Sequence, residues 1–124
     1  MASERRYDDL ATIDDEALAQ LAAVMEDEFV DLLQTYLSNV PRELARLDHG
    51  FASNESERVV ASAHAIKGSS ANLGATRLGA LCSDLERLAR AGVLPPETRQ
   101  LRDDIYAEFA RVKPALETRL KSLE

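Results

Sequence analysis

Apolar residues recur every three or four positions in four successive segments of this chain, which is the spacing of residues on one face of an α-helix. The segments begin near Glu26, after Ser56, at about Ala75 and at about Glu97. No stretch alternates between polar and apolar residues over a useful length, so strands are not expected. Because the connections are short, the four helices can bury their apolar faces only against each other. The pattern therefore predicts an all-α chain folded as an up-down antiparallel four-helix bundle.

The apolar stripes of these segments define the predicted core: Phe29, Leu33, Tyr36, Leu37, Val40, Leu44, Leu47, Phe51, Val59, Ala63, Ile66, Ser70, Leu78, Leu81, Cys82, Leu85, Leu88, Ala89, Leu101, Ile105, Phe109, Val112, Leu116, Leu120 and Leu123. Two prolines fall inside the stripes. Because proline has no backbone N–H, Pro41 should kink or split its helix, and Pro114 should bend or end the last one. Gly74 and Gly92 are expected to terminate the second and third long helices, Gly74 in a left-handed conformation.

A short extra helix is expected at the N-terminus, before the bundle. Thr12 and Asp14 are its candidate N-caps, and its apolar positions are Ala17, Leu18, Leu21 and Ala22. The chain has 124 residues, the size of one domain. We therefore expect a single domain over residues 1–124, with residues 1–11 as a loose lead-in. The initial Met and the short lead-in favour a standalone protein.

The charge and the cysteine count exclude several classes of function. The formal net charge is −7 and no basic stripe is present, so neither nucleic acid nor a membrane surface is an expected partner. No stretch approaches the ~18 apolar residues of a transmembrane helix, and no secretory signal is visible. The single cysteine, Cys82, lies on a buried stripe as a structural thiol, and no ligand cluster for a metal is found. We expect a cytoplasmic monomer.

Packing does not explain the segment 64–75. His64 lies one residue off the buried stripe, about 100° around the helix, on a side that should face solvent. Lys67 follows one turn later, so its ammonium can reach a group attached to the imidazole. Gly68 in mid-helix costs about 1 kcal/mol relative to alanine, which close approach of another backbone beside His64 would offset. The residues that share the side of His64 are Val60, Lys67, Gly68 and Ala71.

An exposed imidazole beside a cation suits a nucleophile that accepts an anionic group from a docking protein. A phosphoryl group is the natural anion, and Lys67 could neutralise the charge on its oxygens. Glu86 is a candidate orienting residue, because His64 and Glu86 are each eleven residues from Ala75 in a predicted helical hairpin. At the same level of the bundle, Glu86 could accept a hydrogen bond from one imidazole nitrogen and leave the other free to attack.

These residues match a known pattern. The motif His64-x-x-Lys67-Gly68-Ser69-Ser70-x-x-Leu73-Gly74-Ala75, followed by Leu78, Leu81-Cys82 and Leu85-Glu86, resembles the histidine phosphotransfer (HPt) domain of multistep phosphorelays. The resemblance extends from about Ile13 to the C-terminus. It implies a helical bundle that carries phosphate on His64, taking it from a receiver-domain aspartate and passing it to another, or the reverse. The implied partners are response-regulator receivers and the receiver of a hybrid sensor kinase.

The resemblance also implies how the chemistry is divided. The receiver supplies Mg²⁺ and an acidic pocket, whereas this chain supplies His64 and Lys67 and needs no cofactor of its own. Val60, Gly68 and Ala71 would form the contact surface. A histidine autokinase is disfavoured, because the chain has no room for an ATP-binding domain and no glycine-rich phosphate loop. A helical module that docks a receiver without accepting phosphate is the alternative function.

Several residues keep an alternative interpretation without chemistry. Gly68 could be a helix-packing glycine, with Gly79 in a similar role, and Lys67 could be a solvated charge. Glu86 could be an ordinary surface acid. His49 is interpreted as a solvated residue near a helix end. Ser69 and Ser70 more naturally satisfy backbone groups or pack than react.

Overall fold

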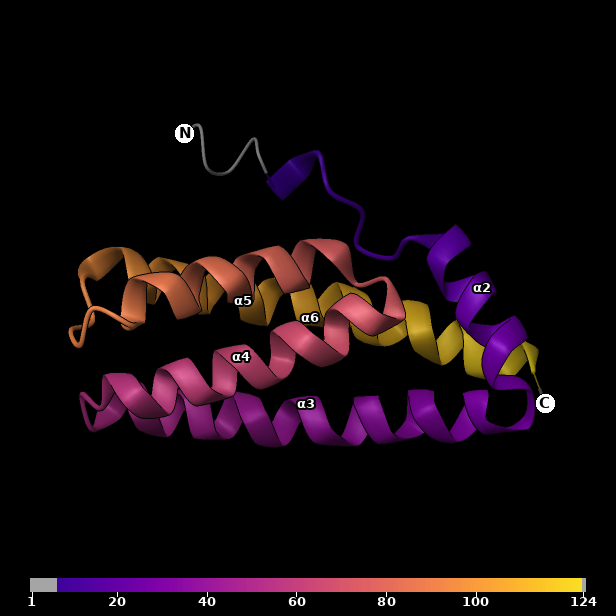
Figure 1. Ribbon diagram of the computed structural model, residues 1–124, viewed down its shortest axis with the longest axis horizontal. Coiled ribbons are helices and arrows are strands. Elements are labelled where there is room, and N and C mark those ends of the chain that lie inside the picture. Colours follow the sequence, from indigo (N-terminus) through magenta and orange to yellow (C-terminus); the bar gives the residue numbers. More distant parts are fainter. Residues whose placement is uncertain (1–6, 124) are drawn as a thin grey trace.

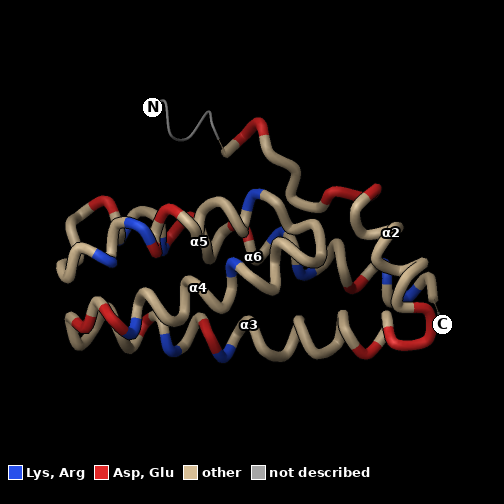
Figure 2. Tube along the Cα trace, in the orientation of Figure 1, with Lys and Arg blue, Asp and Glu red and all other residues tan. Residues whose placement is uncertain are grey.

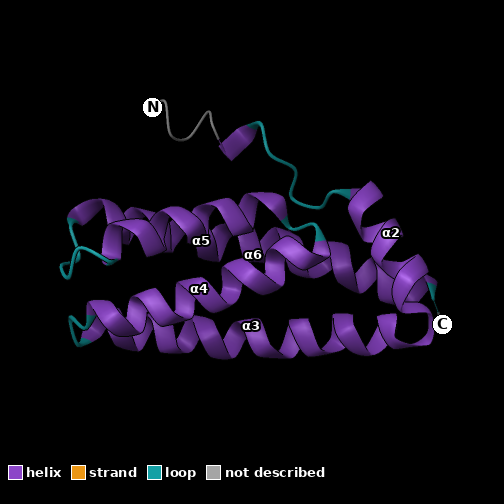
Figure 3. Ribbon diagram, viewed as in Figure 1, coloured by secondary structure: helices purple, strands orange, loops and turns teal. Residues whose placement is uncertain are grey.

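Four long helices and one short helix make up most of the described part of the chain. The computed structural model describes residues 7–123. The elements are α2 (Asp15–Met25), a 3₁₀ turn (Glu26–Glu28), α3 (Phe29–Ala52), α4 (Ser56–Leu73), α5 (Thr76–Ala89) and α6 (Pro96–Ser122). Figure 1 shows α3, α4, α5 and α6 side by side along the long axis, with α2 across one end. The described residues contain helices and loops but no strand, as Figure 3 shows. The predicted all-α bundle with a short N-terminal helix is confirmed.

The buried core consists of the predicted stripes with few exceptions. Leu37, Leu88 and Leu120 are half-buried against it. Leu123 was expected in the core but is 51% exposed, at the C-cap position that follows Ser122, the last residue of α6. No helix in residues 7–123 is both long enough and apolar enough to cross a membrane.

The two internal prolines do not interrupt their helices. α3 continues through Pro41 and α6 continues through Pro114. Of the predicted alternatives, a split of α3 and an end of α6 at these prolines are therefore wrong. Both prolines are exposed, and the carbonyl group that each leaves without a donor can be hydrated there. Burial of the apolar stripe on the opposite side of each helix stabilises the helical turn that contains the proline.

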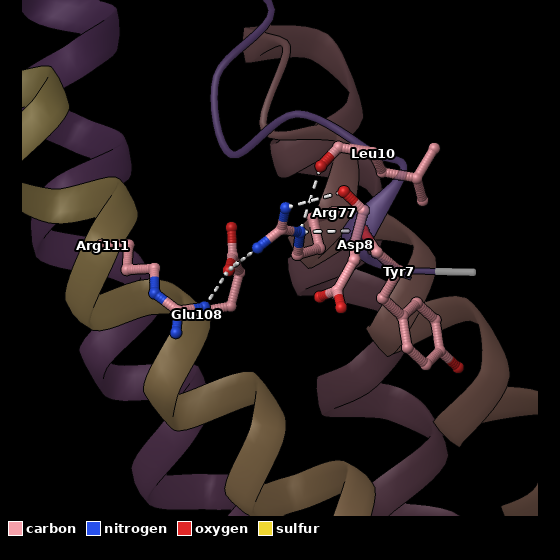
Figure 4. Close-up of polar contacts among 6 residues, drawn as sticks. All are labelled: Tyr7, Asp8, Leu10, Arg77, Glu108 and Arg111. Carbon is pink, nitrogen blue, oxygen red and sulfur yellow. Dashed lines mark hydrogen bonds and ion pairs between the residues drawn. The ribbon is translucent and has the colours of Figure 1, made fainter. Parts of the chain in front are cut away.

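The segment before α2 is fixed to the bundle rather than loose. Tyr7 is buried, and the Arg77 side chain of α5 donates hydrogen bonds to the carbonyls of Tyr7 at 2.8 Å, Leu10 at 3.1 Å and Asp8 at 3.3 Å. Figure 4 shows this guanidinium between the N-terminal carbonyls and the buried carboxylate of Glu108. The expected loose lead-in is therefore wrong from Tyr7 onward, and residues 1–6 lie outside the described part of the chain.

The turn between α4 and α5 is fixed by contacts with the segment that precedes α2. Gly74 ends α4 with φ +82°, as predicted, and a side chain there would meet the Asp14 carbonyl oxygen at 3.0 Å. The Asp14 N–H donates to the Gly74 carbonyl at 2.8 Å. Asp14, not Thr12, is the N-cap of α2, and its carboxylate accepts from the Ala17 N–H. The N-terminal segment thus stabilises the α4–α5 hairpin, in which α4 carries His64.

Candidate functional site

Helix α4 presents His64 to solvent. Its stripe of Val59, Ala63, Ile66 and Ser70 is buried, and the His64 side chain, one residue off that stripe, is 65% exposed. Gly68 and Ala71 are also exposed, while Val60 and Lys67 are half-buried. The prediction that the His64 side of α4 largely faces solvent is therefore confirmed.

Helix α5 brings a buried carboxylate beneath this histidine. Glu86 is only 4% exposed, and its Oε2 lies 3.1 Å from His64 Nδ1. Its other oxygen, Oε1, forms an ion pair with Lys67 Nζ at 2.7 Å. Arg90, at the C-cap of α5, also contacts Oε2. The hairpin level predicted the contact of Glu86 with His64 but not its ion pair with Lys67. Because Glu86 is buried and holds both side chains, the interpretation of Glu86 as an ordinary surface acid is wrong.

The protonation state of Glu86 determines which imidazole nitrogen is free. Burial raises the pKa of Glu86, but the contacts from Lys67, Arg90 and His64 outweigh it and lower the pKa to about 2. The carboxylate is therefore ionised at neutral pH and can only accept hydrogen bonds. His64 Nδ1 must then carry the hydrogen in this contact. The lone pair of the neutral ring is left on Nε2, the nitrogen that Glu86 does not contact.

Neither glycine of the α4–α5 pair is required by packing. A Cβ at Gly79 of α5 would lie 3.9 Å from both Ala71 N and the Lys67 carbonyl oxygen, an ordinary van der Waals distance that the two helices can accommodate. A Cβ at Gly68 would meet nothing within 4 Å. Packing does not require glycine at position 68, so the helix-packing interpretation of Gly68 is wrong.

The hydroxyls next to the motif are satisfied inside the protein. The Tyr36 and Ser70 hydroxyls pair at 2.8 Å between α3 and α4, and burial of the phenol raises the pKa of Tyr36 to about 12. The Ser69 hydroxyl donates to the Ala65 carbonyl at 3.2 Å. These serines hold the helix and its neighbour in place, as the sequence suggested.

The remaining histidine, His49, lies away from this cluster, exposed in the last turn of α3. Cys82 is buried one helical turn before Glu86 on α5, where desolvation and the nearby Glu86 charge raise the pKa of its thiol. Within residues 7–123, no three His, Cys, Asp or Glu side chains are arranged to hold a metal ion.

Comparison with known proteins identifies the family. The sequence profile of the Hpt domain matches residues 31–124, a span that includes His64, Lys67 and Glu86. The chain belongs to the Hpt domain family. Its structure is similar to that of histidine-containing phosphotransfer protein B from Pseudomonas aeruginosa PAO1, with a TM-score of 0.85, 32% identity, and coverage of 90% of this chain and 96% of that one.

A second solved structure supports the fold. The HPT domain of the Hpt sensor hybrid histidine kinase from Shewanella has a TM-score of 0.74 at 14% identity, with 90% of this chain and 95% of that chain covered. No curated protein matches this Hpt domain at a significant level. Hpt domains serve as phosphotransfer modules in phosphorelays, where they work with receiver domains.

Sequence reasoning missed one member of the charged cluster in this Hpt domain. Arg90 follows Glu86 by four residues, the spacing at which an acid and a base meet on a helix, and that signal could have revealed it. It was overlooked because Arg90 lies at the predicted end of its helix. Together with Lys67 it compensates the buried charge of Glu86.

Lowering the pH should remove the contribution of Glu86 to the free energy of unfolding of this Hpt domain. The pKa of Glu86 falls from 4.5 to about 2 on folding, so its contribution is complete above about pH 5 and is lost as pH falls through 4.5 toward 2. The shift corresponds to at most about 3 kcal/mol, and to less because the exposed His64 and Arg90 are screened by solvent.

Urea unfolding of wild type and Glu86→Gln across this pH range measures the effect. The free energies of unfolding should differ most at pH 7 and converge near pH 2. The matched control is Glu57→Gln, an exposed carboxylate on the same helix as His64, which should show no such convergence. If the difference in free energy of unfolding between wild type and Glu86→Gln did not change with pH, a stabilising role of the ionised carboxylate would be contradicted.

Proposed function

We propose that this Hpt domain carries a phosphoryl group on His64, which it accepts from the aspartate of a receiver domain and passes to another receiver, or the reverse. The observation that carries the proposal is the exposed imidazole whose Nδ1 is held by the buried, ionised Glu86. Lys67 on the same carboxylate brings an ammonium next to the ring. The 32% identical Pseudomonas protein bears the name of a histidine-containing phosphotransfer protein, which supports the same role.

The transfer is an in-line displacement at phosphorus. The Nε2 lone pair of His64 forms the N–P bond while the P–O bond to the receiver aspartate breaks, and the electron pair leaves with the aspartate carboxylate. His64 keeps its hydrogen on Nδ1, so the ring becomes cationic and Glu86 balances that charge. Holding the two groups in line removes part of the entropic barrier. Mg²⁺ bound by the receiver stabilises the charge on the phosphoryl oxygens.

In this function the domain is a carrier rather than a kinase. It takes phosphate from a receiver of a hybrid sensor kinase or of a response regulator and does not phosphorylate itself from ATP. It works as a monomer in the cytoplasm, and Val60, Gly68 and Ala71 contribute to the surface that the receiver covers. The three residues lie on the His64 side of α4, and two of them are exposed.

Label transfer tests the function directly. Candidate receiver domains charged with radioactive phosphate are mixed with the protein, and acid-labile, alkali-stable label is followed on the Hpt chain. The expected result is rapid transfer of label from at least one receiver to His64, located by peptide mapping. A receiver that binds the protein but never transfers label would instead identify a docking module.

Lys67→Ala is expected to slow transfer by about one to two orders of magnitude, as loss of a single charge-stabilising donor does in other transition states. The Lys67 side chain is 34% exposed, so its removal leaves no large cavity. Rapid-quench measurement of transfer from a labelled receiver gives the rate, with Lys113→Ala on α6 as the matched surface control. Equal rates for the two variants would reduce Lys67 to a structural partner of Glu86.

A further inference from the structure

A groove runs between α3 and α4 beside the candidate phosphoacceptor. It has a volume of about 320 Å³. Ala65 and Ser69 form its wall on α4, and Ala65 directly follows His64. Its α3 side includes Asn39, Val40, Arg42, Glu43 and Arg46. His64 therefore lies between Glu86 on one side and this groove on the other.

The packing of α3 against α4 sets the level of the groove. Gly50 lies against Val59, where a Cβ would meet Val59 Cγ2 at 3.0 Å, and the two helices run antiparallel from that point. Counting back from this contact places Ala45 of α3 at the level of His64. Arg42 lies three positions N-terminal to that level and Arg46 lies one position C-terminal to it. Because they are four residues apart, they share one face of α3.

The charge of this groove is opposite to that of the whole chain. Arg46 pairs with Glu43 at 2.9 Å, and Arg42 is exposed with no ion-pair partner among residues 7–123. The groove thus has one net positive charge, and the cluster of Lys67, Arg90 and Glu86 has another. The chain as a whole has a net charge of −7. Figure 2 shows acidic positions gathered instead at the turn between α2 and α3, which contains Glu26, Asp27 and Glu28.

We infer that Arg42 and Arg46 dock the acidic surface of the receiver domain and select the receivers from which His64 takes phosphate. The inference rests on the proposed function. A partner that transfers phosphate from an aspartate holds Mg²⁺ with carboxylates, so the surface facing His64 is acidic. Complementary charge accelerates encounter and discriminates between partners. The small side chains of Ala65 and Gly68 let that surface approach both His64 and the groove.

The test compares charge reversal in the groove with an equal reversal elsewhere. The probe is a purified receiver domain that exchanges radioactive phosphate with the wild type. Arg42→Glu/Arg46→Glu should lower the second-order transfer rate at low salt by about tenfold or more. It should also reduce the fall of that rate with added salt. Lys113→Glu/Lys121→Glu on α6, which does not contact α4, makes the same change in net charge and should stay within about threefold of wild type.

Direct labelling by phosphoramidate, which needs no docking, separates the two proposals. The groove variant should be labelled on His64 at the wild-type rate and keep the wild-type unfolding midpoint. Transfer from the receiver equal to that of the α6 control would overturn the role of Arg42 and Arg46 and leave the phosphocarrier function standing. A groove variant that changes only self-association in sedimentation would also overturn it, by assigning the groove to a second copy of the chain. Failure of wild type to accept label from any receiver or from phosphoramidate would overturn both.

Discussion

His64→Gln is expected to fold like the wild type and to accept no phosphoryl group from any receiver. The side chain is 65% exposed and contacts the rest of the protein through Glu86, to which a glutamine amide can also donate. The free energy of unfolding should therefore change by less than about 1 kcal/mol. The amide has no nucleophilic nitrogen lone pair, so the N–P bond cannot form.

The measurement is acid-labile label on the Hpt chain after incubation with a charged receiver. His49→Gln is the matched control, because His49 is the other histidine of the chain and is also exposed. This control should be labelled like wild type. Acid-labile phosphate on His64→Gln, at any other residue, would refute the assignment of the phosphoacceptor.

Gly68→Gln is expected to abolish productive receiver binding while stabilising the isolated domain. Gly68 lies in the interior of α4 at an ordinary helical φ, and a Cβ there meets nothing within 4 Å. Replacing a mid-helix glycine should therefore stabilise the fold by about 0.5–1 kcal/mol. The new side chain projects from the exposed face one turn after His64, where the receiver backbone must approach, and a loss of binding of at least about 100-fold should follow.

A graded series separates steric blocking from other causes. Gly68→Ala adds one carbon and should weaken binding much less than Gly68→Gln. Ala110→Gln places the same side chain on an exposed position of α6 and should leave binding unchanged. Titration of a labelled receiver gives the affinity, and thermal unfolding gives the stability. If Gly68→Gln binds the receiver as well as Ala110→Gln does, close approach at this glycine is excluded.

The parts of the fold that follow from side-chain periodicity were predictable. Helical stripes gave the four long helices, and counting from Ala75 placed Glu86 opposite His64. The ion pairs of Glu86 were harder to predict from the sequence, because they depend on where the charged group at the end of each long side chain lies. Lys67 was expected to reach a group attached to the imidazole, and its ion pair with Glu86 Oε1 was not predicted.

The contacts that could not be predicted from the sequence involve backbone groups. The N-terminal segment is held through the carbonyls of Tyr7, Asp8 and Leu10, and a carbonyl is the same in every residue. Only Arg77, which carries the donors, was visible, and nothing in its spacing shows which carbonyls it will meet. Similarly, the continuity of α3 through Pro41 reflects burial of the opposite face, a tertiary effect that local propensity does not contain.

The contact between Glu86 and His64 Nδ1 has a chemical consequence for the product. With one ring nitrogen occupied, the proposed phosphorylation gives one regioisomer, the tele form substituted at Nε2. The pros form would require the phosphorus to displace the buried carboxylate from its place against the ring. In the proposed function, the helical hairpin thus determines which nitrogen of His64 carries the phosphoryl group, before any receiver arrives.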